Sequence, residues 1–252
     1  MSANNLPPLL EIVDLCHSYT LNGVAEPVLN NISLSIRAGE WVCLIGRSGC
    51  GKSTLLKIVA GFLAPAGGQC LLSGKRIVKP GPDRCVVFQE DALFPWLTVR
   101  ENIGFGLSGS SGAQRRLDTE QLIELVGLQG YGDSLPRTLS GGMKQRVALA
   151  RVLIRSPRIL LMDEPFGALD AQTREEMQEL LLRLAMERNL TILFVTHDVQ
   201  EAAIIADRVL ILDRDSGQIR EPAPIALPRP RNRSSQDFQA LCARLQIGRA
   251  HV

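Results

Sequence analysis

The most informative residues for chemistry form a glycine-rich stretch, "GRSGCGKS", from Gly46 to Ser53. Its spacing is G-x-x-x-x-G-K-[ST], in which the glycines let backbone N–H groups surround phosphate oxygens. In such a loop Lys52 neutralises the terminal phosphates and Ser53 binds magnesium. An apolar run, "WVCLIG", comes before it and a helical pattern, "KSTLLKIVAGFL", follows. This order predicts a nucleotide-phosphate site, whereas a structural glycine turn would need neither neighbour.

Polar side chains end three further apolar runs: "ILLMDE" ends in Asp163 and Glu164, "CVVFQ" in Gln89, and "TILFVTH" in His197. Because the carboxyl ends of parallel strands meet at one edge of a sheet, we expect these side chains to face the phosphate site. There Asp163 orients magnesium through its water shell, and Glu164 polarises an attacking water. Structural alternatives exist for the others: Glu164 as a charge at a helix start, His197 as a satisfied polar residue, and Gln89 as a strand terminator.

A second glycine-rich helix start, "LSGGMKQRVALAR", begins at Leu139. Ser140 takes the capping position, and two glycines precede an apolar-periodic stretch. The Ser140 hydroxyl and the N–H groups of Gly141 and Gly142 suit an anion, provided that one is brought to them. Since the chain already has a phosphate loop, this helix start raises the question of whose nucleotide it binds.

The surrounding pattern predicts the elements that position these residues. Apolar runs without alternation indicate a parallel sheet covered on both faces, with amphipathic helices between the strands. Residues before about Arg37 read as antiparallel strands, and residues from Asp91 to Leu139 read as helices and loops. We therefore expect an α/β fold of the P-loop NTPase class, with a RecA-like parallel sheet core, an N-terminal antiparallel β-subdomain and an inserted α-helical subdomain. The expected division is an ATPase domain at 8–220, with the helical insertion at about 91–155, and a Pro/Arg-rich linker with a C-terminal helix at 221–252.

Composition limits the function classes. The chain has 252 residues, a formal charge of +2 and six cysteines without a CxxC pair. This charge is a poor match for a nucleic-acid binder, and the cysteines are expected to be small core residues in a reducing compartment. No segment approaches the length of a membrane span, so a membrane role requires a partner.

The C-terminal tail carries two expectations. Arg229, Arg231 and Arg233 lie among prolines and are expected to form a solvated linker. The following "SSQDFQALCARLQ" places Phe238, Leu241 and Leu245 on one helical face, which predicts a helix that docks on the catalytic domain.

With all these motifs in this order, the chain from about Tyr19 to Asp213 resembles the nucleotide-binding subunit of ATP-binding cassette (ABC) transporters. The resemblance implies that the helix start at Leu139 binds the γ-phosphate of ATP held by a second copy, so that two copies close head to tail around two ATP molecules. It also implies that Tyr19 stacks on the adenine and that Asp170, in "GALD", takes part in communication between subunits.

The same resemblance completes the site. It implies that Glu164 is the catalytic base and that His197 contacts the γ-phosphate. It also implies that Gln89 senses magnesium and relays this signal to the membrane partner. The implied ATP-binding residues of the phosphate loop and signature are Gly46, Ser48, Gly49, Cys50, Gly51, Lys52, Ser53, Thr54, Ser140, Gly141 and Gly142, and the implied Mg²⁺ residues are Ser53, Gln89 and Asp163. Met143 departs from the commonest signature, LSGGQ, which puts its role in orienting the neighbouring nucleotide's sugar in doubt.

Two longer stretches, "GPDRCVVFQEDALFPWLTVRENIGFGL" and "IALPRPRNRSSQDFQAL", resemble the importer subfamily for nitrate, taurine and alkanesulfonates. This implies a peripheral protein at the cytoplasmic face of the plasma membrane, with permease subunits as partners and an extracytoplasmic substrate-binding protein as an indirect one. Phe94 and Trp96 then contribute to the permease groove, unless they pack internally. The alternative function is a soluble ABC ATPase of iron–sulfur cluster assembly. A chromosome-maintenance or translation ATPase would need a long coiled coil or two cassettes.

Overall fold

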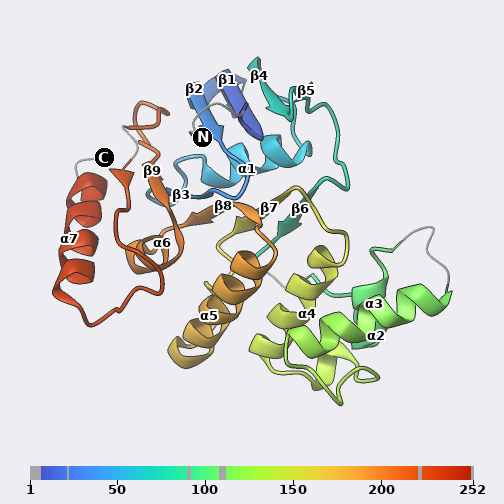
Figure 1. Ribbon diagram of the computed structural model, residues 1–252. Helices are drawn as coiled ribbons and strands as arrows, with labels where there is room; N and C mark the ends of the chain where they lie inside the picture. Colours follow the sequence, from blue (N-terminus) through green and yellow to red (C-terminus); the bar gives the residue numbers. More distant parts are fainter. Residues whose placement is uncertain (1–6, 22, 90–91, 108–111, 221–222, 251–252) are drawn as a thin grey trace. The chain divides into compact units, whose positions relative to one another are not determined.

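A computed structural model describes residues 7–21, 23–89, 92–107, 112–220 and 223–250 (Figure 1). The chain forms two compact units, one of Met1–Gly81 with Asn189–Val252 and the other of Pro82–Arg188. Asp91, where we expected the helical insertion to begin, lies outside the described residues. The expected α/β fold class is confirmed, since each unit combines strands with helices.

The first unit contains an antiparallel sheet. Its strand order is β2-β1-β4-β5, and its members are β1 (Leu10–Leu21), β2 (Val24–Ile36), β4 (Gly67–Leu72) and β5 (Lys75–Arg76). Leu10 pairs with Ile36 and Leu21 with Val24, so the first two strands form the expected N-terminal hairpin. The sequence did not indicate the other two strands.

The first unit also contains parallel strands around β3 (Trp41–Ile45), all of whose residues are buried. On either side of it run β8 (Thr191–Thr196) and β9 (Arg208–Ile211), and β10 (Ala223–Pro224) adds to β9 in antiparallel orientation. The helices of this unit are α1 (Lys52–Ala60), α6 (Val199–Ile205) and α7 (Gln236–Ala250). The predicted order of strand, glycine loop and helix is therefore confirmed.

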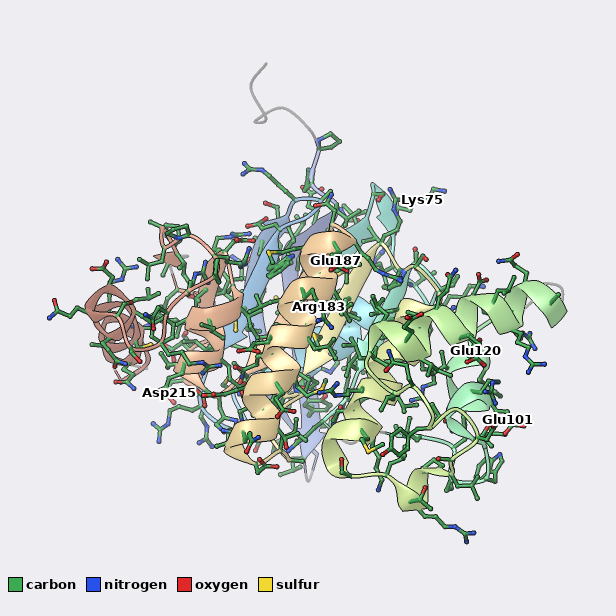
Figure 2. All side chains as sticks on the ribbon, turned by 60° about the horizontal axis from the view of Figure 1, so that its bottom comes forward. Lys75, Glu101, Glu120, Arg183, Glu187 and Asp215 are labelled. Atoms are coloured by element: carbon green, nitrogen blue, oxygen red, sulfur yellow. The ribbon has the colours of Figure 1, made fainter. Side chains whose placement is uncertain are left out.

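The second unit holds one parallel strand pair, β6 (Arg84–Val87) with β7 (Ile159–Asp163). Its helical elements are α2 (Val99–Gly104), α3 (Gly112–Leu125), the 3-10 turn η1 (Pro136–Thr138), α4 (Gly141–Leu153) and α5 (Ala171–Glu187). The described chain between β6 and β7 is helical, as the sequence predicted. Figure 2 shows charged side chains on these helices, among them Glu101, Glu120, Arg183 and Glu187.

The C-terminal tail agrees with one of its two predictions and differs from the other. α7 forms as predicted, with Phe238, Leu241 and Leu245 buried. The prediction of a solvated linker is wrong for Arg229 and Arg231, because both side chains are partly buried and hydrogen-bonded. The physical reason is that α6 ends beside them, and the last carbonyls of a helix need donors from elsewhere.

Two further expectations concern the cysteines and the membrane. All six cysteines are free; Cys43, Cys50, Cys70 and Cys242 are buried, and Cys16 and Cys85 are half-buried. Burial raises the pKa of the Cys43 thiol well above its usual value, which keeps it protonated as a core residue. Among the helices in the described ranges, none has the length and apolar character that crossing a bilayer demands.

Candidate functional site

The phosphate loop joins β3 to α1 in the first unit. A Cβ at Gly46 would lie 2.6 Å from the Cys50 Sγ and 2.8 Å from the Leu212 carbonyl oxygen. A Cβ at Gly51, whose φ is +102°, would lie 2.7 Å from the Val28 Cγ1. Only glycine fits these two places, and a tight glycine loop of this kind suits the wrapping of backbone N–H groups around an anion. Ser48 and Gly49 belong to the same loop, and Ser53 and Thr54 to the first turn of α1.

Lys52 is the charged group of this loop and is only 5% exposed. Its Nζ donates to the carbonyl oxygens of Gly46 and Arg47, both at 3.1 Å. An ammonium group that donates to neutral acceptors forms stronger hydrogen bonds when anionic oxygens replace those acceptors, because charge-assisted hydrogen bonds are about twice as strong as bonds between neutral groups. This position suits the phosphate contact that the sequence predicts for Lys52.

Tyr19 lies against the first turn of α1. Its hydroxyl is 3.3 Å from the Thr54 Oγ1, and its ring meets the His17 ring edge-on with centroids 4.9 Å apart. Tyr19 remains 41% exposed. A fixed, exposed aromatic face beside a phosphate loop suits stacking of a nucleotide base.

His197 leaves the sheet at the same edge as the phosphate loop. Ile45 pairs with Thr196 in parallel register, so the next residues, Gly46 and His197, emerge from neighbouring strands side by side. The Thr196 hydroxyl donates to the Glu201 Oε2 at 2.6 Å and accepts from the Asp198 N–H at 3.0 Å. His197 itself is exposed, on a turn that this buried hydrogen bond fixes.

In the second unit, Asp163 ends β7 and Glu164 follows with a φ of +46°. A left-handed backbone at a non-glycine residue costs about 1–3 kcal/mol and occurs preferentially at functional sites. The Gly167 N–H donates to the Glu164 carbonyl at 3.1 Å and closes the turn. The Gln89 Nε2 lies 3.2 Å from the position of a Cβ on Gly167, so the Gln89 amide packs against this turn. The sheet edge thus brings together the predicted Gln89, Asp163 and Glu164.

The predicted signature helix start is α4. Ser140 is its N-cap and accepts a hydrogen bond from the Met143 N–H at 3.3 Å, so its capping role is confirmed. A Cβ on Gly142 would lie 2.4 Å from the Thr173 Cγ2, whereas one on Gly141 would be 3.8 Å from its nearest neighbour, in Leu169. Glycine at 142 is therefore required by contact with α5.

Asp170 caps α5 beside the signature. It accepts from the Thr173 N–H at 3.0 Å and from the Thr173 hydroxyl at 2.7 Å. These hydrogen bonds lower the pKa of Asp170 below its usual value. Thr173 thus connects Asp170 to Gly142 within this unit.

Sequence reasoning missed several residues that support the site. Gln145 donates to the Gln89 carbonyl at 3.0 Å, Thr173 contacts Gly142, and Glu201 fixes the turn at His197. Each of these side chains contacts a residue of another segment, so a pattern within its own segment does not indicate the contact. Glu201 alone had a local signal, a spacing that resembles a capping box.

A buried lysine in a glycine loop, set between a parallel strand and a helix, defines the class as a P-loop nucleotide-binding protein. The second unit adds adjacent carboxylates and a second glycine-rich helix start. The ABC transporter family model matches residues 29–167. The chain belongs to this family and is an ATP-binding subunit whose ATPase activity is coupled to transport.

Relatives and solved structures agree with this assignment. The chain is 45% identical to the aliphatic sulfonates import ATP-binding protein SsuB of Bacillus subtilis over 228 residues, covering 90% of this chain and 89% of that protein. It is 46% identical to the nitrate import ATP-binding protein NrtD of Synechocystis over 231 residues, covering 89% and 87%. The dimeric, post-hydrolysis ATP-binding cassette MJ0796 bound to ADP and Pi has a TM-score of 0.76 at 30% identity, covering 87% of this chain and 100% of that chain.

Proposed function

We propose that this chain powers the import of a small oxyanion, of the nitrate or sulfonate type, through a membrane permease. The observation that carries the proposal is the similarity to SsuB and NrtD along about nine-tenths of the chain. The alternative of iron–sulfur cluster assembly has no corresponding relative among those named above.

The first unit supplies the ATP-binding half of the proposed site. Lys52 exchanges the carbonyl oxygens of its own loop for β- and γ-phosphate oxygens, and the loop N–H groups bind the remaining ones. Tyr19 stacks on the adenine, held at its hydroxyl by Thr54. His197 donates a hydrogen bond to the γ-phosphate from the strand beside β3.

The second unit supplies the hydrolytic half. Glu164, directed by its left-handed backbone, accepts a proton from the attacking water. No group of three or more His, Cys, Asp or Glu side chains in the described ranges forms a metal site by itself, which fits an ion held largely by phosphates and water. Ser53, Gln89 and Asp163 are the residues proposed to hold Mg²⁺ there, and the ion would neutralise charge that develops on the phosphates.

A second copy completes each site in this proposal. Ser140 and the first N–H groups of α4, at Gly141 and Gly142, bind the γ-phosphate of ATP on the partner, because N–H groups in the first turn of a helix have no intrahelical acceptor. ATP thus closes two copies head to tail, and loss of the γ-phosphate releases them. The solved cassette MJ0796 is dimeric, which supports this arrangement.

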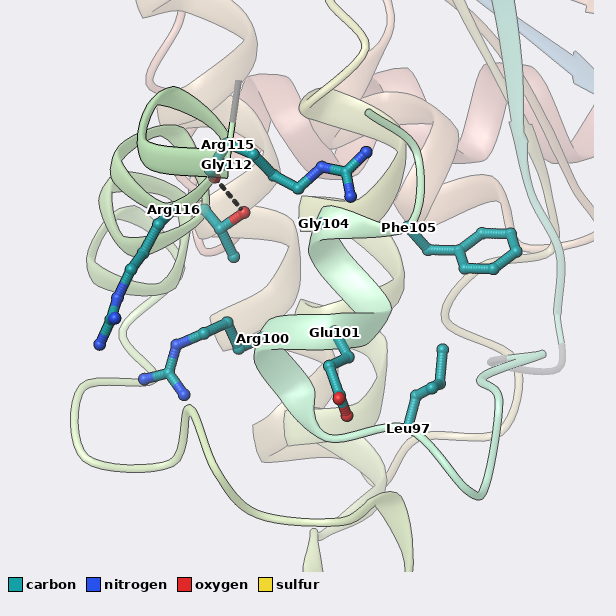
Figure 3. A pocket seen from close by; sticks show the side chains of 9 residues that line it. Leu97, Arg100, Glu101, Gly104, Phe105, Gly112, Arg115 and Arg116 are labelled. Atoms are coloured by element: carbon teal, nitrogen blue, oxygen red, sulfur yellow. Dashed lines mark hydrogen bonds between the residues drawn. The ribbon is translucent and has the colours of Figure 1, made fainter. Parts of the chain in front are cut away.

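The surface for the permease is proposed to lie on the helical part of the second unit. Trp96 is 71% exposed and Phe105 is 64% exposed, and the half-buried Phe94 ring lies between them, with centroids 5.6 Å and 4.6 Å away. A neighbouring hollow has a volume of about 500 Å³. Figure 3 shows side chains that line it, with Phe105 on the α2 side and Arg115 on the α3 side. Exposed aromatic side chains beside a charged hollow suit a short amphipathic segment of a partner.

We place the chain peripherally at the cytoplasmic face of the membrane, where these aromatic side chains can contact such a segment of the permease. Substrate choice then belongs to the permease and its extracytoplasmic binding protein.

The test uses a variant that binds ATP but does not hydrolyse it. Tagged Glu164→Gln protein is expressed in its native cells, membranes are solubilised gently with ATP and Mg²⁺, and copurifying proteins are identified. We expect a multi-spanning permease, and we expect the matched Glu164→Gln/Trp96→Ala protein to recover much less of it. Recovery of soluble scaffold proteins alone would contradict the importer and favour the assembly alternative.

A further inference from the structure

The tail of the chain holds α6, the helix that begins two residues after His197. We call residues 223–246 the C-terminal segment. Within it the Arg231 Nη1 donates to three carbonyl oxygens at the end of α6, those of Ala203 at 2.8 Å, Ile204 at 3.3 Å and Ala206 at 2.6 Å. Its Nε donates to the Leu227 carbonyl at 3.0 Å. The guanidinium therefore satisfies acceptors that the helix cannot satisfy itself, at the negative end of the helix dipole.

Arg231 remains a cation in this position. Burial, together with the smaller effect of the neighbouring Arg229, lowers the pKa of Arg231 to about 10. A group with that pKa is still protonated at neutral pH. The desolvated charge is matched by aligned carbonyl dipoles, an arrangement that the planar fork of arginine suits better than the single ammonium of lysine.

Arg229 fixes the same segment to the strand side of α6. Its guanidinium carbon lies 3.8 Å from the centroid of the buried Trp41 ring, and its Nη1 is 2.9 Å from the Asp207 Oδ1. Asp207 in turn accepts from the Trp41 N–H at 2.9 Å. Arg229 also donates to the Ile205 carbonyl, the last of α6. Two arginines thus contact the end of one short helix.

α7 packs against α6. It runs beside α6 (Figure 1) and buries Phe238, Leu241 and Leu245. A hollow of about 370 Å³ is lined by His197, the first residues of α6 and Gln246 of α7. The C-terminal segment therefore reaches from one end of α6 to the turn that carries His197.

The other end of α6 is tied to that turn. Asp198 caps the helix by accepting from the Gln200 N–H at 2.7 Å and the Glu201 N–H at 3.3 Å. Glu201, in the first turn of α6, accepts the Thr196 hydroxyl at 2.6 Å. A shift of α6 would therefore move the residues on both sides of His197. With seven residues, α6 is too short to hold its own place, so its position depends on what packs around it.

We infer that the C-terminal segment positions His197 for its γ-phosphate contact, and that Arg231 is a positioning residue that acts through α6. The inference rests on the proposed role of His197. It assigns to the tail a part in ATP hydrolysis, through residues that are not among those proposed to bind ATP.

The test is a double-mutant cycle on the full-length protein, with kcat and KM for ATP measured for wild type, Arg231→Ala, His197→Ala and the double variant. We expect Arg231→Ala to lower kcat about tenfold with little change in KM or in binding of a fluorescent ATP analogue, because misplacement of a group by even 1 Å is costly. In the His197→Ala background, Arg231→Ala should cause no further loss. Arg231→Lys, which keeps the charge but not the fork, should lie between wild type and Arg231→Ala. Arg76→Ala, at an exposed arginine on β5 of the same unit, is the matched control and should match wild type.

Several outcomes would overturn the inference. An equal loss from Arg231→Ala in both backgrounds would mean that Arg231 only supports folding. Wild-type kcat in Arg231→Ala, together with reduced kcat in His197→Ala, would remove the positioning role and leave the role of His197 intact. Wild-type kcat in His197→Ala would remove the proposed role of His197 and the inference with it. If Arg231→Ala does not fold, Arg231→Lys takes its place in the cycle and the same comparisons decide.

Discussion

At the scale of single residues, the signature glycines are not equivalent. Gly142 faces the Thr173 methyl group so closely that a Cβ would lie 2.4 Å from it, whereas Gly141 has room. The sequence predicted the glycines as phosphate ligands through their N–H groups. The structure adds that Gly142 also allows α4 to approach α5, a constraint that belongs to the pair and is invisible in either segment alone.

We predict that Gly142→Ala destabilises the nucleotide-free protein by about 1–3 kcal/mol, because the stiff Thr173 side chain cannot move away without losing its bond to Asp170. Thermal unfolding measures the loss. Gly141→Ala is the matched control and should leave stability unchanged or slightly raised, since alanine favours helix. Thr173→Ser removes the facing methyl group and should restore most of the lost stability in the Gly142→Ala protein. Equal effects of the two alanine substitutions would contradict the assigned contact.

Asp170 provides a prediction on pH. Its pKa is lowered in the folded protein by the two hydrogen bonds from Thr173, so the unfolded chain, with an aspartate pKa of about 3.9, binds its proton first as the pH falls. The stability from this cap is fully present above that value and declines as the pH falls through the lower, folded pKa. Unfolding by denaturant at pH 7 and at pH 3 should therefore show a larger decrease for wild type than for Asp170→Asn. A parallel decrease in both proteins would mean that this carboxylate is not involved.

At the scale of elements, Asn102 organises the loop that carries the proposed permease contacts. This fully buried amide donates to the carbonyls of Phe94, Leu97 and Thr98 and accepts from the Phe94 N–H at 2.9 Å. The loop between Phe94 and Thr98 is therefore shaped by one side chain of α2, which holds Trp96 exposed.

We predict that Asn102→Ala lowers the free energy of unfolding by about 2–4 kcal/mol, since it leaves several backbone groups of the loop unpaired. The same variant should lose recovery of the permease. Trp96→Ala should lose permease recovery without a change in unfolding free energy, which separates the contact from its support. Chemical denaturation and the copurification assay measure the two effects. Loss of stability in Trp96→Ala would favour internal packing of this ring instead.

The elements also show what a sequence can and cannot predict. The strands β3, β6, β7 and β8 followed from apolar runs, and the helices α1, α4 and α7 from periodicity, because these signals lie within each element itself: α4 begins at its Ser140 cap, and α7 buries the predicted residues. The short strands β4 and β5 carried no such signal. The burial of Arg231 could not be predicted from the sequence, because its partners are carbonyl oxygens of α6. Every residue has a backbone carbonyl, so residue types do not indicate which of them accept a hydrogen bond. The same reason hid the bond from Gln145 to the Gln89 carbonyl.

At the scale of the whole molecule, the two compact units divide the proposed chemistry. The phosphate loop, Tyr19 and His197 belong to one unit, and Glu164 and the signature helix start belong to the other. The sequence indicated the phosphate loop, His197, Glu164 and the signature helix start as local motifs at the end of a strand or the start of a helix, and Tyr19 through the family resemblance. The two glycine-rich helix starts raised the question of whose nucleotide the second one binds, and the family resemblance then implied a second copy.

The proposed head-to-tail dimer leads to the last prediction, which contrasts two variants that are both expected to lack ATPase activity. Glu164→Gln retains Lys52 and the signature, so with ATP and Mg²⁺ it should bind nucleotide and elute as a dimer in size-exclusion chromatography with light scattering. Lys52→Ala removes the cation from the phosphate loop, so it should bind ATP weakly and remain a monomer under the same conditions. ATP stabilises the dimer only to the extent that it binds the dimer more tightly, so raising ATP should increase the dimer fraction of Glu164→Gln. Adding Gly142→Ala with Thr173→Ser to Glu164→Gln tests the signature at near-normal stability, and an unchanged dimer fraction there would show that the helix start tolerates an added methyl group. A Glu164→Gln protein that stays monomeric at saturating ATP would contradict the proposal that the γ-phosphate joins two copies.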